Sequence, residues 1–145
     1  MRKIEGDGWK AFVLAAPRPA ICAIVLSDGR PHATPVWVDI DGDEVVFTTS
    51  QEESKGRALP REPRVSLCVQ DDQPPFGFVS IQGVAAVIDD GEAVKVWAAR
   101  IGGRYMGADR ADEYGRKNGV PGQVLVRVRP TKIVGYVEMA GPAVS

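Results

Sequence analysis

Residues 20–49 read AICAIVLSDGRPHATPVWVDIDGDEVVFTT, and this stretch decides the fold class. Residues 20–26 are apolar on both alternating faces, which is typical of a strand covered on both sides. Turn-forming residues follow, and a second strand is expected over residues 32–40. Asp41-Gly42 is a strong hairpin signal before a third strand at residues 44–49. The sequence therefore predicts three strands joined by two tight turns, an antiparallel meander.

Three further strands follow along the chain. Alternating or apolar runs predict them at residues 65–69, 76–88 and 124–137. We expect the second of these to bend near Gly83 and the third near Pro130. Arg127 and Arg129 of the last strand are expected on its outer face, in a solvated or dimer-edge role, and the alternative is contact with the tail of a ligand. Six strands with short turns and no alternation with helices predict a mainly β domain, an antiparallel barrel with a few short helices.

Helical periodicity and capping residues predict those helices. Asp7 precedes an apolar stripe at helical spacing, and its side chain can cap a short helix. Ser50 and Glu53 fit a capping box, so a second short helix is expected directly after Ser50. Helical spacing returns from Asp90, and Gly102-Gly103 is expected to end that helix. A polar stretch over residues 109–118 predicts another.

Composition excludes several classes of protein. The chain has 145 residues, with 18 Lys and Arg against 19 Asp and Glu, one His and two Cys. This balance argues against nucleic-acid binding, which needs a surplus of basic residues. One His and two Cys cannot supply the four ligands of a structural zinc cage, so no metal is expected. No run approaches the roughly 20 apolar residues of a membrane span. We expect one cytoplasmic domain, residues 1–145, with no membrane partner and with Cys22 and Cys68 as reduced thiols.

The sequence lacks the common catalytic motifs. No phosphate-binding loop, nucleophile elbow or zinc-protease motif is present, so the catalytic residues stay unassigned. The most concentrated chemical signal is FTTSQEESKGR, residues 47–57, which leaves a strand through hydroxyl residues and enters a helix with Lys55 and Arg57. Helix N–H groups, hydroxyls and two cations can together hold a phosphate. The alternative is an ordinary capped surface helix with solvated basic residues.

A set of segments in fixed order is more specific than any one of them. The segments are DGRPHATPVW (28–37), FTT (47–49), KGRAL (55–59), PRV (63–65), PPFGFV (74–79), IQG (81–83) and RYMG (104–107). Together they resemble the split barrels related to pyridoxamine 5'-phosphate oxidase. More narrowly, they are similar to the actinobacterial branch that uses the deazaflavin coenzyme F420. The resemblance spans roughly residues 10–137.

This resemblance implies a six-stranded split β-barrel of the FMN-binding, Greek-key type, which forms a homodimer with cofactor sites between the protomers. The segment beneath the deazaflavin ring would be His32, Thr34, Pro35, Val36 and Trp37. His32 would line the site without an acid or base role. The tail and its phosphate would be held by Thr48, Thr49, Ser50, Lys55, Gly56 and Arg57. Relatives often carry Asn where this chain has Ala58, so one hydrogen bond to the tail is in doubt.

Two aromatic residues are implied to come from the other protomer. Phe76 and Phe78 would close the groove over the cofactor, and the alternative is that they only pack the interface. The function implied is an F420-dependent oxidoreductase that passes a hydride to a small conjugated electron acceptor, such as a biliverdin-like tetrapyrrole, a quinone or an enone. Two alternatives stay open: an FMN-binding oxidase or flavin reductase of the same fold, and a non-enzymatic cofactor carrier.

Overall fold

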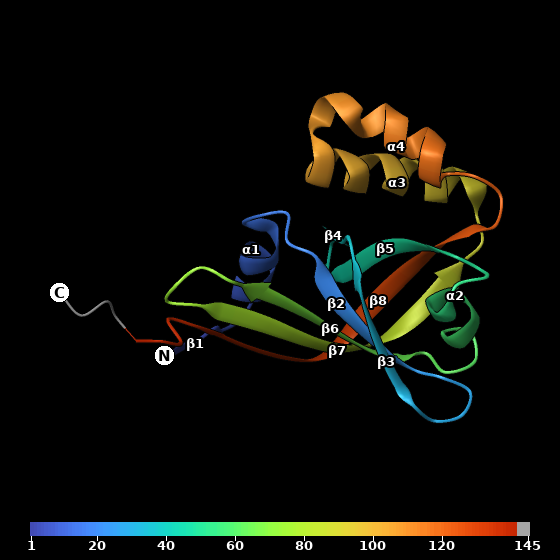
Figure 1. Cartoon of the computed structure of the whole chain (residues 1–145). Helices are drawn as coiled ribbons and strands as arrows, with labels where there is room; N and C mark the ends of the chain where they lie inside the picture. The colour runs from blue at the N-terminus through green and yellow to red at the C-terminus, as the bar shows by residue number, and fades with distance from the viewer. Residues whose placement is uncertain (142–145) are drawn as a thin grey trace.

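The computed structural model describes residues 1–141, so the last four residues of the predicted domain lie outside the description. Its strands form one antiparallel sheet in the order β3-β2-β6-β7-β8-β5-β4, with β1 paired to β8. The strands are β1 (Arg2–Lys3), β2 (Ala20–Val25), β3 (Pro31–Val36), β4 (Asp39–Asp41), β5 (Glu44–Ser50), β6 (Arg64–Asp71), β7 (Gly77–Ile88) and β8 (Gln123–Val137). Figure 1 shows the strands curling around one another, with the helices outside them.

The prediction of a mainly β, antiparallel split barrel is confirmed, with eight strands in place of six. One addition is the two-residue strand β1. The other arises because the predicted strand 32–40 is two strands, β3 and β4, separated by Trp37 and Val38. β3 pairs with β2, whereas β4 pairs with β5. β3 and β4 therefore stand at opposite ends of the strand order, and the two-residue break between them brings the two edges of the sheet together.

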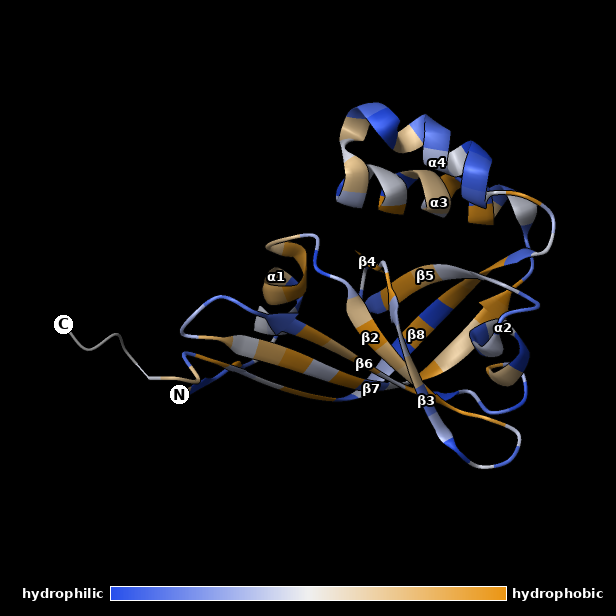
Figure 2. Cartoon of the chain, viewed as in Figure 1, coloured by the Kyte–Doolittle hydropathy of each residue, from blue (hydrophilic) through white to orange (hydrophobic). Residues whose placement is uncertain are grey.

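Alternating side chains of the strands fill the interior of the barrel. Phe47, Leu67, Ile81 and Val126 are fully buried there, with Trp9 and Val13 of helix α1 (Gly8–Leu14) in the same cluster. A second, smaller cluster lies on the outer face of β5 and β8, under helix α3 (Gly91–Met106). Figure 2 shows the apolar colour on the side of α3 that faces the sheet.

Helix α3 covers part of the outer face of β8. Leu125 is buried beneath α3, and Arg127 lies on the same side of β8. The Arg127 guanidinium pairs with Asp41 at 2.8 Å and lies 5.7 Å from the centre of the Trp97 ring. Arg127 is therefore partly covered by α3 and paired within the chain rather than solvated, whereas Arg129 is exposed as expected.

The predicted irregularities in the two longest strands are confirmed. The register between β7 and β8 shifts between Gln82 and Gly83, where the partners are Lys132 and Pro130. A Cβ atom at Gly83 would lie 2.6 Å from Val128 Cγ1, so the strands approach too closely there for any other residue.

The helix starts were predicted with mixed success. Helix α3 begins directly after Asp90, as expected, and the Asp90 carboxylate caps it by accepting hydrogen bonds from the Glu92 and Ala93 amides. Asp7 stands before α1, but its side chain makes no capping hydrogen bond. The predicted capping box is also wrong. Helix α2 (Ser54–Ala58) begins after Glu53, and the Ser50 hydroxyl accepts from the Glu52 amide in a turn before the helix.

The predicted break at Gly102-Gly103 does not occur, because α3 continues to Met106. The glycines instead let helix α4 (Ala111–Asn118) pack closely against α3. A Cβ atom at Gly102 would lie 2.2 Å from Tyr114 Cβ. The predicted helix over residues 109–118 is confirmed by α4, which a short 3₁₀ turn (Ala108–Arg110) precedes. Within residues 1–141, no helix is long and apolar enough to cross a membrane.

Candidate functional site

A cleft of about 370 Å³ lies between the outer face of the barrel and α3, and we name it the Lys55 cleft. It opens where β3 ends and the chain crosses to β4. Five residues predicted from the resemblance line it: Pro35, Val36, Trp37, Thr48 and Lys55. Its other lining residues are Pro19, Glu53, Ala98, Ile101, Gly102 and Asn118. The structure therefore brings together residues from β3, β5, α2 and α3.

Lys55 is the buried cation of this cleft. Its side chain is 10% exposed, and its Nζ donates a hydrogen bond of 3.1 Å to Thr34 Oγ1. The Glu53 carboxylate lies 3.7 Å from Nζ and is 60% exposed. Thr49 Oγ1 donates a hydrogen bond of 3.1 Å to the same Glu53 oxygen. A chain of polar contacts thus joins the two threonines through Lys55 and Glu53.

The second predicted cation of α2 lies elsewhere. Two residues apart on an α-helix are about 200° apart around its axis, so Lys55 and Arg57 face different sides. Arg57 is exposed and lines a separate cleft of about 410 Å³, together with Asp28, Ser54 and Arg61. The structure does not bring the two cations together on one anion within this chain.

Gly56, between these cations, has a packing role. A Cβ atom there would lie 2.0 Å from the Ser50 carbonyl oxygen, so glycine allows α2 to lie against the end of β5. Ala58 is buried in the barrel core, away from the lining of the Lys55 cleft. Ser50 is half-buried and Thr49 is buried.

An aromatic group backs the cleft at the break between β3 and β4. The Trp37 ring stacks on the Tyr105 ring with centroids 5.0 Å apart and planes 4° apart. The Tyr105 hydroxyl donates to the Arg18 carbonyl at 2.7 Å and accepts from the Val38 amide at 3.1 Å. These bonds hold the two-residue break that separates the edge strands.

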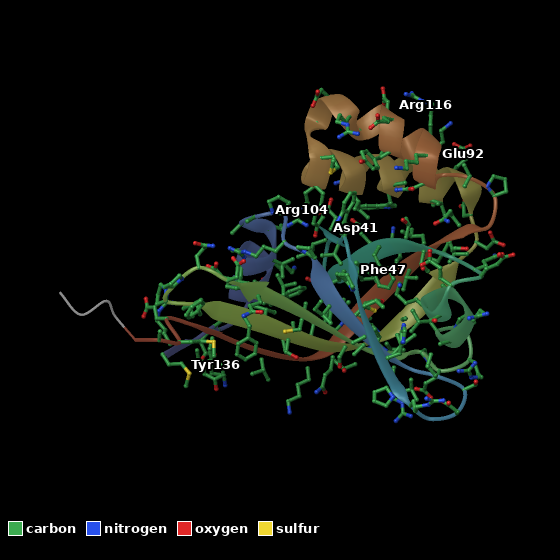
Figure 3. All side chains as sticks on the ribbon, in the orientation of Figure 1. Asp41, Phe47, Glu92, Arg104, Arg116 and Tyr136 are labelled. Atoms are coloured by element: carbon green, nitrogen blue, oxygen red, sulfur yellow. The ribbon has the colours of Figure 1, made fainter. Side chains whose placement is uncertain are left out.

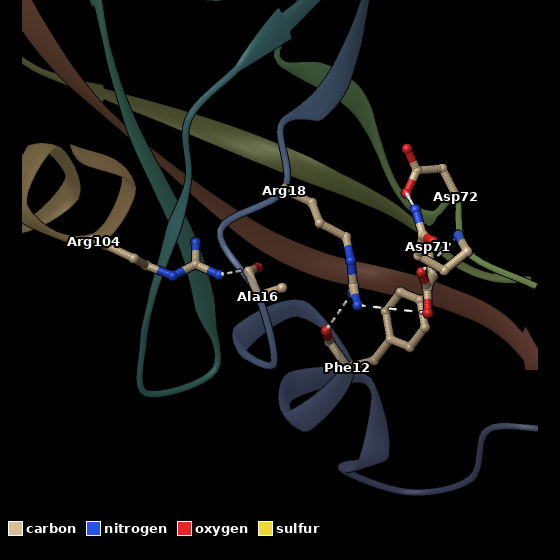
Figure 4. Close-up of polar contacts among 7 residues, drawn as sticks. Phe12, Ala16, Arg18, Asp71, Asp72 and Arg104 are labelled. Carbon is tan, nitrogen blue, oxygen red and sulfur yellow. Dashed lines mark hydrogen bonds and ion pairs between the residues drawn. The ribbon is translucent and has the colours of Figure 1, made fainter. Parts of the chain in front are cut away.

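Arg104 supports the same break from the last turn of α3. Its guanidinium donates to the carbonyl of Val38, to that of Val13 at 2.6 Å and to that of Ala16 at 3.0 Å. Figure 4 shows Arg104 reaching Ala16. Arg104 and Tyr105 belong to the segment RYMG, but the sequence predicted no role for either residue. A basic residue in the last turn of a helix was the available signal.

The chain between α1 and β2 is anchored a second time by Arg18. Its guanidinium lies 5.0 Å from the centre of the Phe12 ring and donates to the Phe12 carbonyl at 3.2 Å. It also pairs with Asp71 at 3.6 Å, as Figure 4 shows. Pro19, which lines the Lys55 cleft, follows directly and is positioned by this anchor.

Phe76 and Phe78 lie in a different, apolar cleft of about 540 Å³, which we name the Phe76 cleft. Its other lining residues are Cys68, Gln70, Gly77, Met139 and Ala140. Phe76 is 40% exposed and Met139 is 43% exposed. Phe78 packs against Tyr136 with ring centroids 6.1 Å apart. Figure 3 places Tyr136 at the end of the sheet away from α3, so the two clefts of one chain are separate.

His32 and Cys22 are titratable residues that line neither of the two named clefts. His32 is half-buried on β3, opposite Ile24 of β2, and lines none of the described clefts. Burial raises the pKa of the Cys22 thiol to about 11, and the charge of nearby Lys55 opposes this rise. Within the described range 1–141, no group of three His, Cys, Asp or Glu side chains could hold a metal ion.

Residues 7–136 match the pyridoxamine 5'-phosphate oxidase family. The chain belongs to this family. The match includes every residue that lines the Lys55 cleft, together with Phe76 and Phe78 of the other cleft. The match to the pyridoxamine 5'-phosphate oxidase family therefore covers strands β2 to β7, nearly all of β8, and the helices α3 and α4.

Solved structures show the same fold. A conserved hypothetical protein from Mycobacterium tuberculosis is 23% identical, with 99% of this chain and 92% of that chain covered and a TM-score of 0.81. An F420 reductase is 25% identical, with 85% and 94% covered and a TM-score of 0.67. A FAD-binding protein from Mesorhizobium loti is 16% identical, with 92% and 93% covered and a TM-score of 0.68. Among curated proteins, a search found no match.

Proposed function

We propose that this member of the pyridoxamine 5'-phosphate oxidase family is a cytoplasmic F420-dependent reductase of the actinobacterial type. Bound F420 would supply a hydride from C5 of its reduced ring to a small conjugated acceptor. The observation that carries the proposal is the Lys55 cleft, which collects five of the residues implied to contact the cofactor. The likeness to an F420 reductase, at 25% identity over most of both chains, supports this cofactor.

The residues of the cleft fit a flat ring with a polar edge. Pro35 is exposed at the end of β3, and it has no N–H, so the neighbouring backbone groups are the ones that can meet a ring. Ala98 and Ile101 of α3 give the cleft an apolar wall. Thr48 of β5 and Lys55 of α2 add polar and charged groups to the lining. The chain's contribution would be to orient the ring and to exclude water around it.

The size of the cleft favours a homodimer. About 370 Å³ is near the lower end of the range for small-molecule sites, so one chain would cover only part of a long cofactor. The apolar Phe76 cleft leaves Phe76 and Met139 partly exposed. We propose that this cleft lies in the dimer interface, with Phe76 and Phe78 closing the partner's cofactor site. The alternative for this pair is packing of the interface alone.

Equilibrium binding tests the cofactor. Quenching of deazaflavin or flavin fluorescence would be measured with F420, FMN and FAD on the purified protein. Binding of F420 that is tighter than binding of either flavin supports the proposal. Tight FMN or FAD binding without F420 binding would replace it with a flavoenzyme of the same fold, which the likeness to a FAD-binding protein favours.

Turnover separates an enzyme from a carrier. Reduced F420 would be mixed with the protein and with biliverdin, quinone and enone acceptors, and its oxidation would be followed by absorbance at the deazaflavin band. Acceptor-dependent oxidation supports a reductase. If F420 binds but no acceptor in the panel speeds its oxidation above the protein-free rate, the carrier hypothesis replaces the reductase.

A further inference from the structure

The contacts of Glu53 show that the Lys55 cleft already contains an anion of its own. Glu53 Oε2 lies 3.7 Å from Lys55 Nζ and accepts the hydrogen bond of Thr49 Oγ1 at 3.1 Å. One carboxylate oxygen therefore meets both a buried cation and a buried hydroxyl. These are two of the groups implied to hold the phosphate of a cofactor.

The burial of the three side chains shows which of them can move. The Lys55 side chain is 10% exposed and Thr49 is buried, whereas the Glu53 side chain is 60% exposed. The cation is thus fixed in the lining of the cleft and the hydroxyl is buried behind it, and the carboxylate reaches both from the solvent side. Rotation of Glu53 into solvent would uncover both without unfolding α2, because Glu53 precedes the helix.

We propose that Glu53 is a specificity-determining residue of this cleft, whose carboxylate competes with the phosphate group of a ligand for Lys55 and Thr49. This inference rests on the proposed function, because it concerns the tail of the same cofactor. A phosphate must displace the carboxylate and overcome its repulsion, whereas a ligand with a neutral hydroxyl tail does not. Glu53 therefore lowers the preference of the cleft for phosphate-bearing ligands.

The neighbouring Glu52 provides a matched control. It carries the same charge one residue earlier and is exposed, and its side chain makes no ion pair among residues 1–141. A general effect of negative charge near the cleft would appear in both Glu52→Gln and Glu53→Gln. An effect of the contact with Lys55 would appear only in Glu53→Gln.

The experiment measures affinities for ligand pairs in which one member carries a phosphate and the other does not. FMN and riboflavin differ by the phosphate alone and give the decisive comparison, whereas F420 is compared with its deazariboflavin core, which lacks the whole phosphate-bearing tail. We expect Glu53→Gln to strengthen binding of the phosphate-bearing member by about three- to tenfold, as for one partly exposed charge pair, and to change the other member less than twofold. Glu52→Gln should leave both affinities within twofold. An unchanged ratio in Glu53→Gln, or equal effects of the two variants, would overturn the inference.

Failure of the proposed function would be distinguishable. If the wild-type protein binds none of these flavins or deazaflavins, the proposed function fails. Inorganic phosphate then serves as the probe, and the NMR signals of the Lys55 side chain report its binding. Stronger phosphate binding by Glu53→Gln than by the wild type and Glu52→Gln supports the competition, and equal binding by all three proteins refutes it.

Discussion

The Lys55 cleft and the Phe76 cleft lie at different ends of the barrel and differ in what their groups contact. In the Lys55 cleft the polar groups are partnered within the chain, through Thr34, Glu53 and Thr49. In the Phe76 cleft, large apolar groups stay partly exposed in the described chain, Phe76 and Met139 among them. The polar groups of the Lys55 cleft can bind a ligand only by giving up hydrogen bonds or ion pairs within the chain. The Phe76 cleft is stabilised when its apolar groups are covered, because covering removes them from water.

The largest effect is expected where α3 and α4 meet above the Lys55 cleft. Gly102→Val would place side-chain atoms where Tyr114 packs, since even a Cβ atom would lie 2.2 Å from Tyr114 Cβ. We expect it to lower the free energy of unfolding by about 3 kcal/mol. Urea denaturation would measure this. Gly91→Ala, at the start of the same helix with no atom near the added Cβ, is the control and should change stability by less than about 1 kcal/mol. Equal effects would refute close packing as the cause.

Arg104→Met comes next, because it removes three hydrogen bonds from a guanidinium to the carbonyls of Val13, Ala16 and Val38. We expect a loss of about 2–3 kcal/mol in the free energy of unfolding, with looser binding of any ligand in the Lys55 cleft. Arg100→Met in the same helix is the control, since Arg100 is exposed and only lies over the Trp97 ring. A variant Arg104→Met as stable as Arg100→Met would contradict the supporting role.

These residues show how far the sequence could predict the fold. Alternation and turn residues predicted the strands, because burial on a sheet imposes a period of two. The glycine pair in α3 was misassigned, because a glycine that ends a helix and one that admits a neighbouring helix look alike in sequence. The break at Trp37 and Val38 was also missed, because its cause is tertiary: β3 and β4 pair at opposite edges of the sheet.

The candidate site was predicted in part for a similar reason. The resemblance named five residues that the structure places around one cleft. Their spacing of two residues places Lys55 and Arg57 on different sides of any helix, but the resemblance could not show that each side faces a separate cleft. That depends on how α2, which begins at Ser54 rather than after Ser50, packs against the strands. The resemblance also could not identify Glu53 as the partner of Lys55, since the capping box gave that side chain another role.

The Phe76 cleft can be tested by placing a charge in it. Phe76→Asp should weaken self-association by roughly tenfold or more, because burial of an unpaired carboxylate in an apolar interface is costly. Sedimentation equilibrium measures the dimer constant. Val120→Asp is the control, because Val120 is similarly exposed at 45% in the loop after α4. A wild-type protein that is monomeric at tens of micromolar, or a fully dimeric Phe76→Asp variant, would refute this interface.

The Lys55 cleft can be tested by comparing its two predicted cations. Lys55→Gln should weaken binding of a phosphate-bearing cofactor by about tenfold, because it removes a charge-assisted contact. Arg57→Gln should have a smaller effect, since Arg57 lines the separate cleft. Fluorescence titration with F420 and FMN would measure both variants. Equal losses in the two variants would show that the cofactor reaches both clefts at once, which would contradict their separation.

The prediction with the smallest expected effect concerns the two cysteines, one of which lies near each cleft. Cys22 is fully buried on β2 opposite Thr34, near Lys55, whereas Cys68 is partly exposed in the Phe76 cleft. Burial raises the pKa of Cys22 from 9.0 to about 11, so the folded state holds its proton more tightly than the unfolded chain. Stability from this difference is fully present below pH 9 and falls as the pH rises toward 11.

Between pH 9 and 10 we expect this one group to remove about 1 kcal/mol from the free energy of unfolding. Chemical denaturation at each pH would compare the wild type with Cys22→Ala, in which that part of the decline should be absent. Cys68→Ala should retain it. Alkylation of the native protein should also modify Cys68 well before Cys22, because Cys22 has no exposed surface. An identical pH dependence in Cys22→Ala, or equal alkylation rates of the two cysteines, would show that the region around Cys22 and Lys55 is as open to water as the Phe76 cleft, and would contradict the contrast between them.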